Sequence, residues 1–108
     1  MDGQWLQQMV QAIVKVANPK QVILFGSRAR GQMDAATDVD LLVIESEPFG
    51  PERSRYREIA RLEDAMGTIP VATDILVYSE EETERLRNSA NHVVARALRE
   101  GKVLHARP

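Results

Sequence analysis

The sequence contains no cysteine, few aromatic residues and no long apolar run. Such absences exclude several classes of protein and several kinds of functional site. Without cysteine there are no disulfides, no thiolate ligands for zinc and no cysteine nucleophile. The longest apolar stretches, such as Val39 to Ile44, are interrupted by charge or far too short to cross a bilayer. The N-terminus carries Asp2 and no basic stretch before an apolar segment. We therefore expect no secretory signal and no membrane partner, and a cytoplasmic location.

An excess of basic charge is also missing. The formal net charge is −2, and there is no lysine-rich tail. Because binding to long nucleic acids normally requires a strong positive bias, we expect no direct long nucleic-acid binding. Apolar residues make up 44% and charged residues 28%, as in ordinary folded proteins. With 108 residues and neither a repeat nor a linker-like segment, the chain is expected to form a single domain over residues 1–108.

Apolar periodicity and turn residues predict a mixed α/β (α+β) domain, in which helices flank a small mixed sheet. Ser79 is the expected N-cap of a helix, with Glu82 completing a capping box, and Gly101 is placed to end the helical region. In the first half of the chain we expect a helix over residues 2–17, a strand over 21–25, a helix start over 27–32 and a strand over 39–44. In the second half we expect a helix over 51–66 and a strand over 71–78. Helix in one or two pieces over 80–100 and a short strand over 102–105 complete the chain.

A candidate phosphate-binding turn follows the first predicted strand. Gly26 and Ser27 lie where that strand ends and a helix should begin. Glycine there lets backbone N–H groups approach an anion closely, and a helix N-terminus adds a favourable dipole. Ser27 could donate a hydroxyl hydrogen bond to a phosphate, while Arg28 and Arg30 could neutralise further phosphate charge. These four residues are the candidate nucleotide-binding set.

Three acidic residues are candidate metal ligands. Asp38 and Asp40 open the next predicted strand, and residues two apart on a strand point to the same face. Mg²⁺ prefers one or two carboxylates together with substrate phosphates. Asp74 interrupts another apolar strand, where a lone buried carboxylate is costly unless it is paired or bound to a metal. If the two strands are neighbours, the three carboxylates suit two ions, with Asp74 as a ligand or as the catalytic base.

The spacing of these residues resembles a known signature. Gly26-Ser27, ten residues and then Asp38-Val39-Asp40 is similar to the G-S-x10-D-x-D pattern of the DNA polymerase beta-like nucleotidyltransferase superfamily. The residues around this motif and those at positions 97–104 look like the minimal nucleotidyltransferase (MNT) branch of the superfamily. Thr37 stands where serine is common and His105 where tyrosine is frequent, but neither difference removes a metal ligand.

This resemblance implies a polymerase beta-like fold and an enzyme that moves AMP from ATP to an acceptor hydroxyl, with Mg²⁺ as cofactor and two ions bound. The superfamily's third carboxylate corresponds to Asp74. Proteins of the MNT branch are often paired with HEPN-domain proteins, and some are antitoxins that attach AMP to a tyrosine of a HEPN ribonuclease. Because the chain has no room for an acceptor domain, we expect either such a protein or a second copy of the chain as the acceptor, so a homo-oligomer stays open.

Two other functions remain open. The chain could neutralise a partner by occlusion without catalysis, or could modify a small molecule, as the aminoglycoside-modifying enzymes of the superfamily do. The individual residues also have simpler interpretations. Gly26-Ser27 could be an ordinary turn, Asp38 a loop cap, Asp74 half of an ion pair with arginine, and Arg28 and Arg30 solvated helix charges.

Outside the motif, ordinary structural roles are favoured. The arginines at 53, 57 and 61 are interpreted as a solvated, salt-bridged helix face, with an acidic or RNA partner as the alternative. His92 and His105 show no metal-site spacing and are expected to be surface or packing residues. Trp5 and Tyr56 are expected in the core, although Trp5 and its helix could instead contact a partner.

Overall fold

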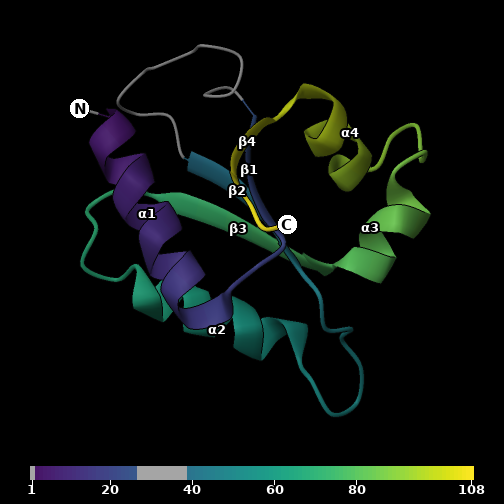
Figure 1. The fold of residues 1–108 in the computed structure, drawn as a ribbon, viewed down its shortest axis with the longest axis horizontal. Coiled ribbons are helices and arrows are strands. Elements are labelled where there is room, and N and C mark those ends of the chain that lie inside the picture. Colours follow the sequence, from purple (N-terminus) through teal and green to yellow (C-terminus); the bar gives the residue numbers. More distant parts are fainter. Residues whose placement is uncertain (1, 27–38) are drawn as a thin grey trace.

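The computed structural model describes residues 2–26 and 39–108, which form helices and strands in the expected alternation (Figure 1). Within these ranges the elements are α1 (Asp2–Ala17), β1 (Gln21–Phe25), β2 (Val39–Glu45), α2 (Arg55–Ala65), β3 (Thr73–Ser79), α3 (Glu80–Leu86), α4 (Val93–Glu100) and β4 (Lys102–Ala106). The helix start predicted over residues 27–32 lies outside the described residues. The predicted fold class, a mixed α+β sheet flanked by helices, is confirmed.

The sheet has four strands in the order β3-β2-β1-β4. Strand β1 runs antiparallel to both of its neighbours, whereas β2 and β3 are parallel. Helices α1 and α2 cover one face, and α3 and α4 cover the other (Figure 1). Strand β2 is therefore central and covered on both sides, as its apolar sequence predicts.

Two apolar clusters, one on each face, hold these layers together. The larger joins Met9 and Ile13 of α1 and Leu62 of α2 to the odd-numbered residues of β2 and β3, such as Leu41, and to the even-numbered residues of β1. The smaller joins Val94 and other α4 residues to the even-numbered residues of β2 and β3 and to the odd-numbered Ile23 of β1. Alternation along the strands thus divides the two cores, and this fixes which face each polar strand residue occupies.

The second helix differs from its prediction in its start and in the face that it buries. It begins at Arg55, after the N-cap Ser54, and not at residue 51. Tyr56 is 82% exposed, so the prediction that it belongs to the core is wrong. The buried positions of α2 are Glu58 and Leu62, four residues apart, and Tyr56 lies two residues before them, on the opposite side of the helix.

The helical region after β3 follows the sequence signals closely. Ser79 caps α3, and its hydroxyl accepts a hydrogen bond from the backbone N–H of Glu82 while the Glu82 carboxylate accepts one from the backbone N–H of Ser79. The predicted capping box is confirmed. His92 caps α4 by accepting a hydrogen bond from the N–H of Val94 through Nδ1, and Gly101 ends that helix. This structural role agrees with the expectation for His92.

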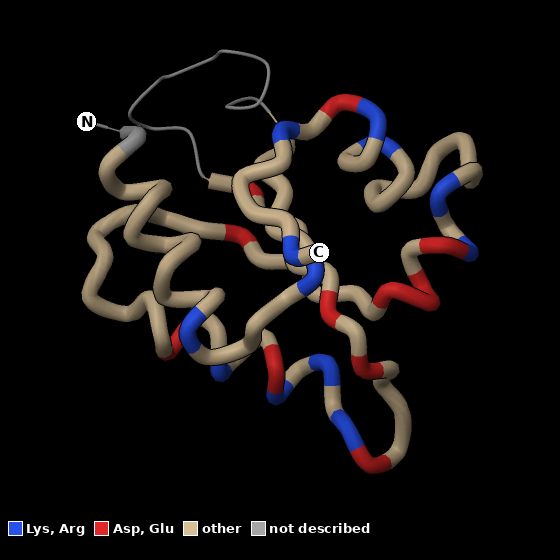
Figure 2. The backbone as a smooth tube through the Cα atoms, viewed as in Figure 1, with Lys and Arg blue, Asp and Glu red and all other residues tan. Residues whose placement is uncertain are grey.

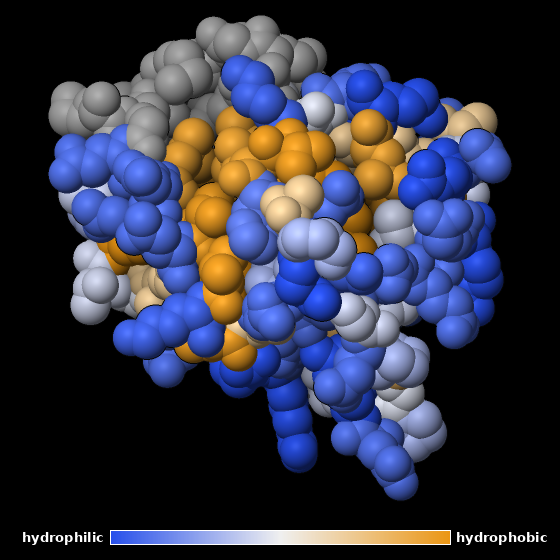
Figure 3. Space-filling view, viewed as in Figure 1, coloured by the Kyte–Doolittle hydropathy of each residue, from blue (hydrophilic) through white to orange (hydrophobic). Residues whose placement is uncertain are grey.

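An exposed apolar surface lies between α1 and β4 (Figure 3). Leu6 and Val10 of α1 and Leu104 of β4 line a shallow hollow there. Trp5, on the same helix, is half-buried. A partner contact through the first helix, the alternative that the sequence leaves open, would use this surface. In the part of the chain that the structure describes, no helix is both long and apolar enough for a transmembrane span.

Candidate active site

Two of the three candidate carboxylates lie side by side at one end of the sheet. Asp40 of β2 is the register partner of Asp74 of β3 in the parallel pair. Adjacent strands are about 4.8 Å apart, and register partners point to the same face. The neighbouring Leu41 and Ile75 belong to the core under α1 and α2, so the two aspartates point to the α3–α4 face.

The exposure of the two carboxylates corrects one prediction. Asp74 is exposed and Asp40 is half-buried, so Asp74 is not the buried carboxylate that its apolar strand suggested. It is the second residue of β3, near the end of the sheet. No arginine pairs with Asp74 within residues 2–26 and 39–108, which removes the ion-pair interpretation for that part of the chain.

Gly26 lies directly against Asp40. Phe25, the last residue of β1, is the antiparallel register partner of Asp40, and Gly26 follows with a φ of +76°. A Cβ atom at position 26 would lie 3.3 Å from Cγ of Asp40 and would overlap its Oδ2 atom. Glycine is therefore required twice, for the left-handed backbone and for the close approach of the chain to a carboxylate.

The remaining candidate residues, Ser27, Arg28, Arg30 and Asp38, lie outside the described residues. The structure thus brings Gly26, Asp40 and Asp74 together, and the functional roles of all seven residues stay predictions. Within the described ranges, no group of three or more metal-type side chains gathers at one point. Asp40 and Asp74 nevertheless form a pair of adjacent carboxylates, which is a donor set that suits a hard divalent cation.

A pocket that the sequence did not predict adjoins this end of the sheet. Phe25 and Gly26 form one wall, and the other wall comes from four residues on one side of α4. Its volume is about 160 Å³, and Gly26 separates it from the Asp40 carboxylate. The four helix residues recur at helical spacing, which was the only available signal: Val93, Arg96, Ala97 and Glu100.

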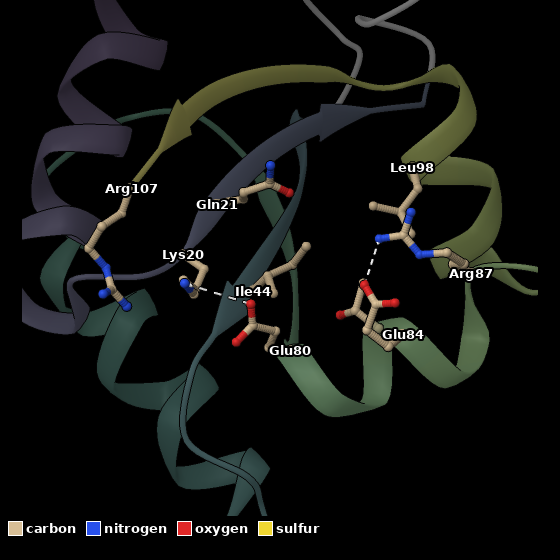
Figure 4. A pocket seen from close by; sticks show the side chains of 9 residues that line it. Lys20, Gln21, Ile44, Glu80, Glu84, Arg87, Leu98 and Arg107 are labelled. Carbon is tan, nitrogen blue, oxygen red and sulfur yellow. Dashed lines mark hydrogen bonds and ion pairs between the residues drawn. The ribbon is translucent and has the colours of Figure 1, made fainter.

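A second pocket, of about 200 Å³, lies at the opposite end of β1 (Figure 4). Lys20 pairs there with Glu80 at 3.7 Å, and Arg87 pairs with Glu84 at 2.8 Å. These charges largely neutralise one another. Because the pocket is remote from Asp40 and four of its charges are already paired, it is not the candidate active site.

The sequence also missed a buried charged cluster beneath α2. Glu45, the last residue of β2, is 3% exposed and Glu58 is 7% exposed. Arg53 pairs with both carboxylates, and Arg61 donates two hydrogen bonds to Glu58. Figure 2 shows this mixture of acidic and basic residues along α2 and the segment before it. The predicted salt bridges of Arg53 and Arg61 are therefore confirmed, but their carboxylates are buried rather than solvated and Arg53 precedes the helix.

This cluster shifts the pKa values of Glu45 and Glu58 in opposite directions. Burial, with the help of neighbouring Glu58, raises the pKa of Glu45 to about 7. Burial also acts to raise the pKa of Glu58, but the hydrogen bonds from Arg61 and the contact with Glu45 outweigh it and lower that pKa. One proton is therefore held on Glu45 at moderately acid pH while Glu58 stays charged. The cluster lies at the far end of β2 from Asp40, so its role is structural.

A small mixed sheet that carries adjacent carboxylates beside a glycine turn, with helices on both faces, defines a nucleotidyltransferase-type domain. The chain belongs to the family described as Polymerase beta, Nucleotidyltransferase, whose profile matches residues 7–108. The superfamily resemblance and the nucleotidyltransferase class are thereby confirmed. No functionally curated protein matches the chain.

Several solved structures share the fold. A protein from Sulfolobus solfataricus, described only provisionally as a nucleotidyltransferase, is 19% identical with a TM-score of 0.66, and the match covers 96% of this chain and 79% of that one. A toxin–antitoxin structure with AMP-PNP is 17% identical, with a TM-score of 0.56 and coverage of 94% and 73%. A tri-AMPylated HEPN toxin in complex with an MNT antitoxin, from Shewanella oneidensis, matches at 16% identity and a TM-score of 0.56, with 99% and 74% covered.

Proposed function

We propose that this nucleotidyltransferase moves AMP from ATP to an acceptor hydroxyl with Mg²⁺ as cofactor, and that the acceptor is a tyrosine of a HEPN-type partner. The observation that carries the proposal is the register pairing of Asp40 with Asp74 beside the Gly26 turn. Adjacent carboxylates repel each other and favour a cation between them. In a chain of this family, such a pair next to an anion-binding turn suits a triphosphate substrate.

Each candidate residue has a role in this proposal. Asp40 and Asp74, together with Asp38, would hold the metal, and Gly26 and Ser27 would cradle the triphosphate with help from Arg28 and Arg30. Bound Mg²⁺, as two ions, would neutralise charge on the carboxylates and the phosphates.

The proposed transfer forms one bond and breaks another at the α-phosphorus. The acceptor oxygen forms a bond to this phosphorus, the bond to the bridging oxygen breaks, and pyrophosphate leaves. The exposed carboxylate of Asp74 is open to an approaching hydroxyl, so it is also the candidate to take the acceptor's proton. The Gly26 backbone lies against the Asp40 carboxylate at the centre of the proposed site.

The partner and the antitoxin role are supported by what the similar structures contain. One of them is an AMPylated HEPN toxin with its MNT antitoxin, and another toxin–antitoxin structure holds AMP-PNP. We propose that the described chain acts in the cytoplasm as one domain and relies on such a partner for its acceptor, with self-association as the alternative.

Labelled ATP tests this function directly. The chain would be incubated with Mg²⁺, α-phosphate-labelled ATP and a HEPN toxin, and the toxin's tyrosines would be analysed by mass spectrometry. We expect label on the toxin, loss of label in Asp40→Asn and Asp74→Asn, and full labelling in Asp64→Asn, which changes an exposed carboxylate of α2. Neutralisation of the toxin without label, unchanged in Asp40→Asn, would show occlusion instead. Pyrophosphate release with an aminoglycoside but not with the toxin would show small-molecule modification.

A further inference from the structure

The pocket between β1 and α4 lies immediately beside the proposed reacting centre. Gly26 belongs both to the pocket wall and to the contact with Asp40. In the strand order β3-β2-β1, Asp40 stands between Asp74 on one side and Phe25 on the other. The pocket therefore lies on the β1 side of the central carboxylate, and the exposed Asp74 lies on the β3 side.

Helix α4 is held firmly against β1, so the pocket has a fixed wall. Val94 and Ala97 are fully buried against the sheet, and the helix start is capped by His92. The helix end approaches β1 closely, because a Cβ atom at Gly101 would lie 2.9 Å from the carbonyl oxygen of Leu24. The four lining residues of α4 are thus presented at a set distance from Phe25 and Gly26.

The lining of the pocket mixes apolar surface with one cation and one anion. Phe25 is a half-buried aromatic residue, and Val93 is 39% exposed. Arg96 and Glu100 lie one helical turn apart on the same side of α4. Among the residues that the structure describes, neither has an ion-pair partner. A phosphate would suit Arg96 but would be repelled by Glu100.

A nucleoside matches this lining better than a phosphate does. Its base offers a flat aromatic surface for Phe25 and Val93, and its hydroxyl or amino groups can donate hydrogen bonds to the Glu100 carboxylate. The Arg96 guanidinium can donate to ring nitrogens or lie over the base. Small-molecule sites commonly combine apolar walls with a few polar groups in this way.

We propose that the pocket formed by Phe25, Gly26 and one side of α4 is the nucleoside subsite of the transferase, with Arg96 and Glu100 as its polar contacts. The nucleoside of the donor then lies on the β1 side of Asp40, and the acceptor hydroxyl approaches on the β3 side, at Asp74. This inference rests on the proposed nucleotidyl transfer and adds where the nucleoside is bound.

Binding measurements with two probes separate the nucleoside from its phosphates. The dissociation constants of ATP and of inorganic tripolyphosphate, each with Mg²⁺, would be measured by calorimetry. Val93→Phe, which fills the pocket from a partly exposed position, and Arg96→Ala should each weaken ATP binding roughly tenfold. Both should leave tripolyphosphate binding unchanged. The matched controls Arg99→Ala, on another side of α4, and Val103→Phe, on β4, should change neither affinity.

The possible failures are distinguishable. If the wild-type chain binds ATP but both pocket variants bind it equally well, the nucleoside lies elsewhere and the proposed transferase function survives. Equal weakening of ATP and tripolyphosphate would make the pocket a phosphate site, which also overturns the inference. If the wild-type chain binds neither probe, the proposed function itself fails. Thermal melting of each variant verifies that it is folded, and Arg96→Ala, an exposed truncation, keeps the test valid should Val93→Phe not fold.

Discussion

Gly26 and Asp40 approach each other so closely that no side chain larger than hydrogen fits at position 26. The glycine has a φ of +76°, and its missing Cβ would overlap the Asp40 carboxylate. The turn after β1 and the start of β2 are separated in the sequence by most of the motif, but in the structure they are in direct contact. This contact links the proposed phosphate-binding turn to the central carboxylate of the candidate site.

Replacing this glycine by alanine should damage the site and the fold together. We expect Gly26→Ala to lower the free energy of unfolding by about 1–3 kcal/mol, because alanine resists a positive φ. Displacement of the Asp40 carboxylate should also reduce AMP transfer. Chemical denaturation and the labelled-ATP assay measure these two effects.

Gly50→Ala is the matched control, because nothing lies within 4 Å of a Cβ atom at that position. It should change neither stability nor transfer appreciably. Equal behaviour of the two alanine variants would show that the close approach of Gly26 to Asp40 has no energetic consequence.

Magnesium should stabilise the protein through Asp40 and Asp74. Binding to the folded state alone at ten times the dissociation constant adds about 1.4 kcal/mol, which raises the melting temperature of a domain this size by roughly 5 °C or more. Asp74→Asn should remove that rise, and without metal it should melt slightly higher than the wild type, because it relieves the repulsion between register partners. Asp64→Asn should keep the full magnesium shift. An equal shift in Asp74→Asn would place the metal elsewhere.

Much of this architecture could be predicted because its signals are local. The strand over residues 21–25 and the Ser79–Glu82 capping box coincide with the structure, since each depends on residues a few positions apart. The family signature likewise depends on fixed spacing. For Asp74 the sequence could predict a carboxylate on a strand, but its pairing with Asp40 depends on the register of two strands separated by a whole helix.

The parts that were missed depend on tertiary packing. Tyr56 fits an apolar pattern, yet it is exposed because α2 buries Glu58 and Leu62 instead. Glu58 can be buried only because Arg53 and Arg61 converge on it, and Arg53 comes from the segment before the helix. The pocket beside α4 likewise requires that helix to pack on β1. No pattern within one segment carries such information.

Glu82 joins two parts of the fold through its carboxylate. It accepts hydrogen bonds from the Ser79 backbone and from the guanidinium of Arg55, and the bonds from Arg55 lower its pKa. The stability from this pair is therefore present above the ordinary glutamate pKa of 4.5 and is lost as the pH falls through the lowered value. Glu82→Gln should be destabilised by about 1–2 kcal/mol at pH 7 and by much less near pH 3. Denaturation curves at both pH values test this, with the exposed Glu84→Gln as control.

Glu45 should show the opposite pH dependence. Its folded pKa of about 7 is raised above the ordinary 4.5, so the folded state holds a proton that the unfolded chain releases. Stability from this group is fully present below pH 4.5 and is lost as the pH rises toward and through 7. Glu45→Gln carries no ionisable group, and its glutamine oxygen can still accept from Arg53. Its free energy of unfolding should therefore gain about 2–3 kcal/mol relative to the wild type between pH 5 and pH 8.

The free energy of unfolding of Glu45→Gln and of the wild type would be measured by denaturation across this pH range. Taking the difference between the two removes the contribution of all other titrating groups. Glu47→Gln, whose carboxylate also faces Arg53 but is 78% exposed, is the control and should show a flat difference. If the difference for Glu45→Gln were equally flat, Glu45 would be ionised at neutral pH. Arg53 would then outweigh both the burial of Glu45 and the neighbouring charge of Glu58.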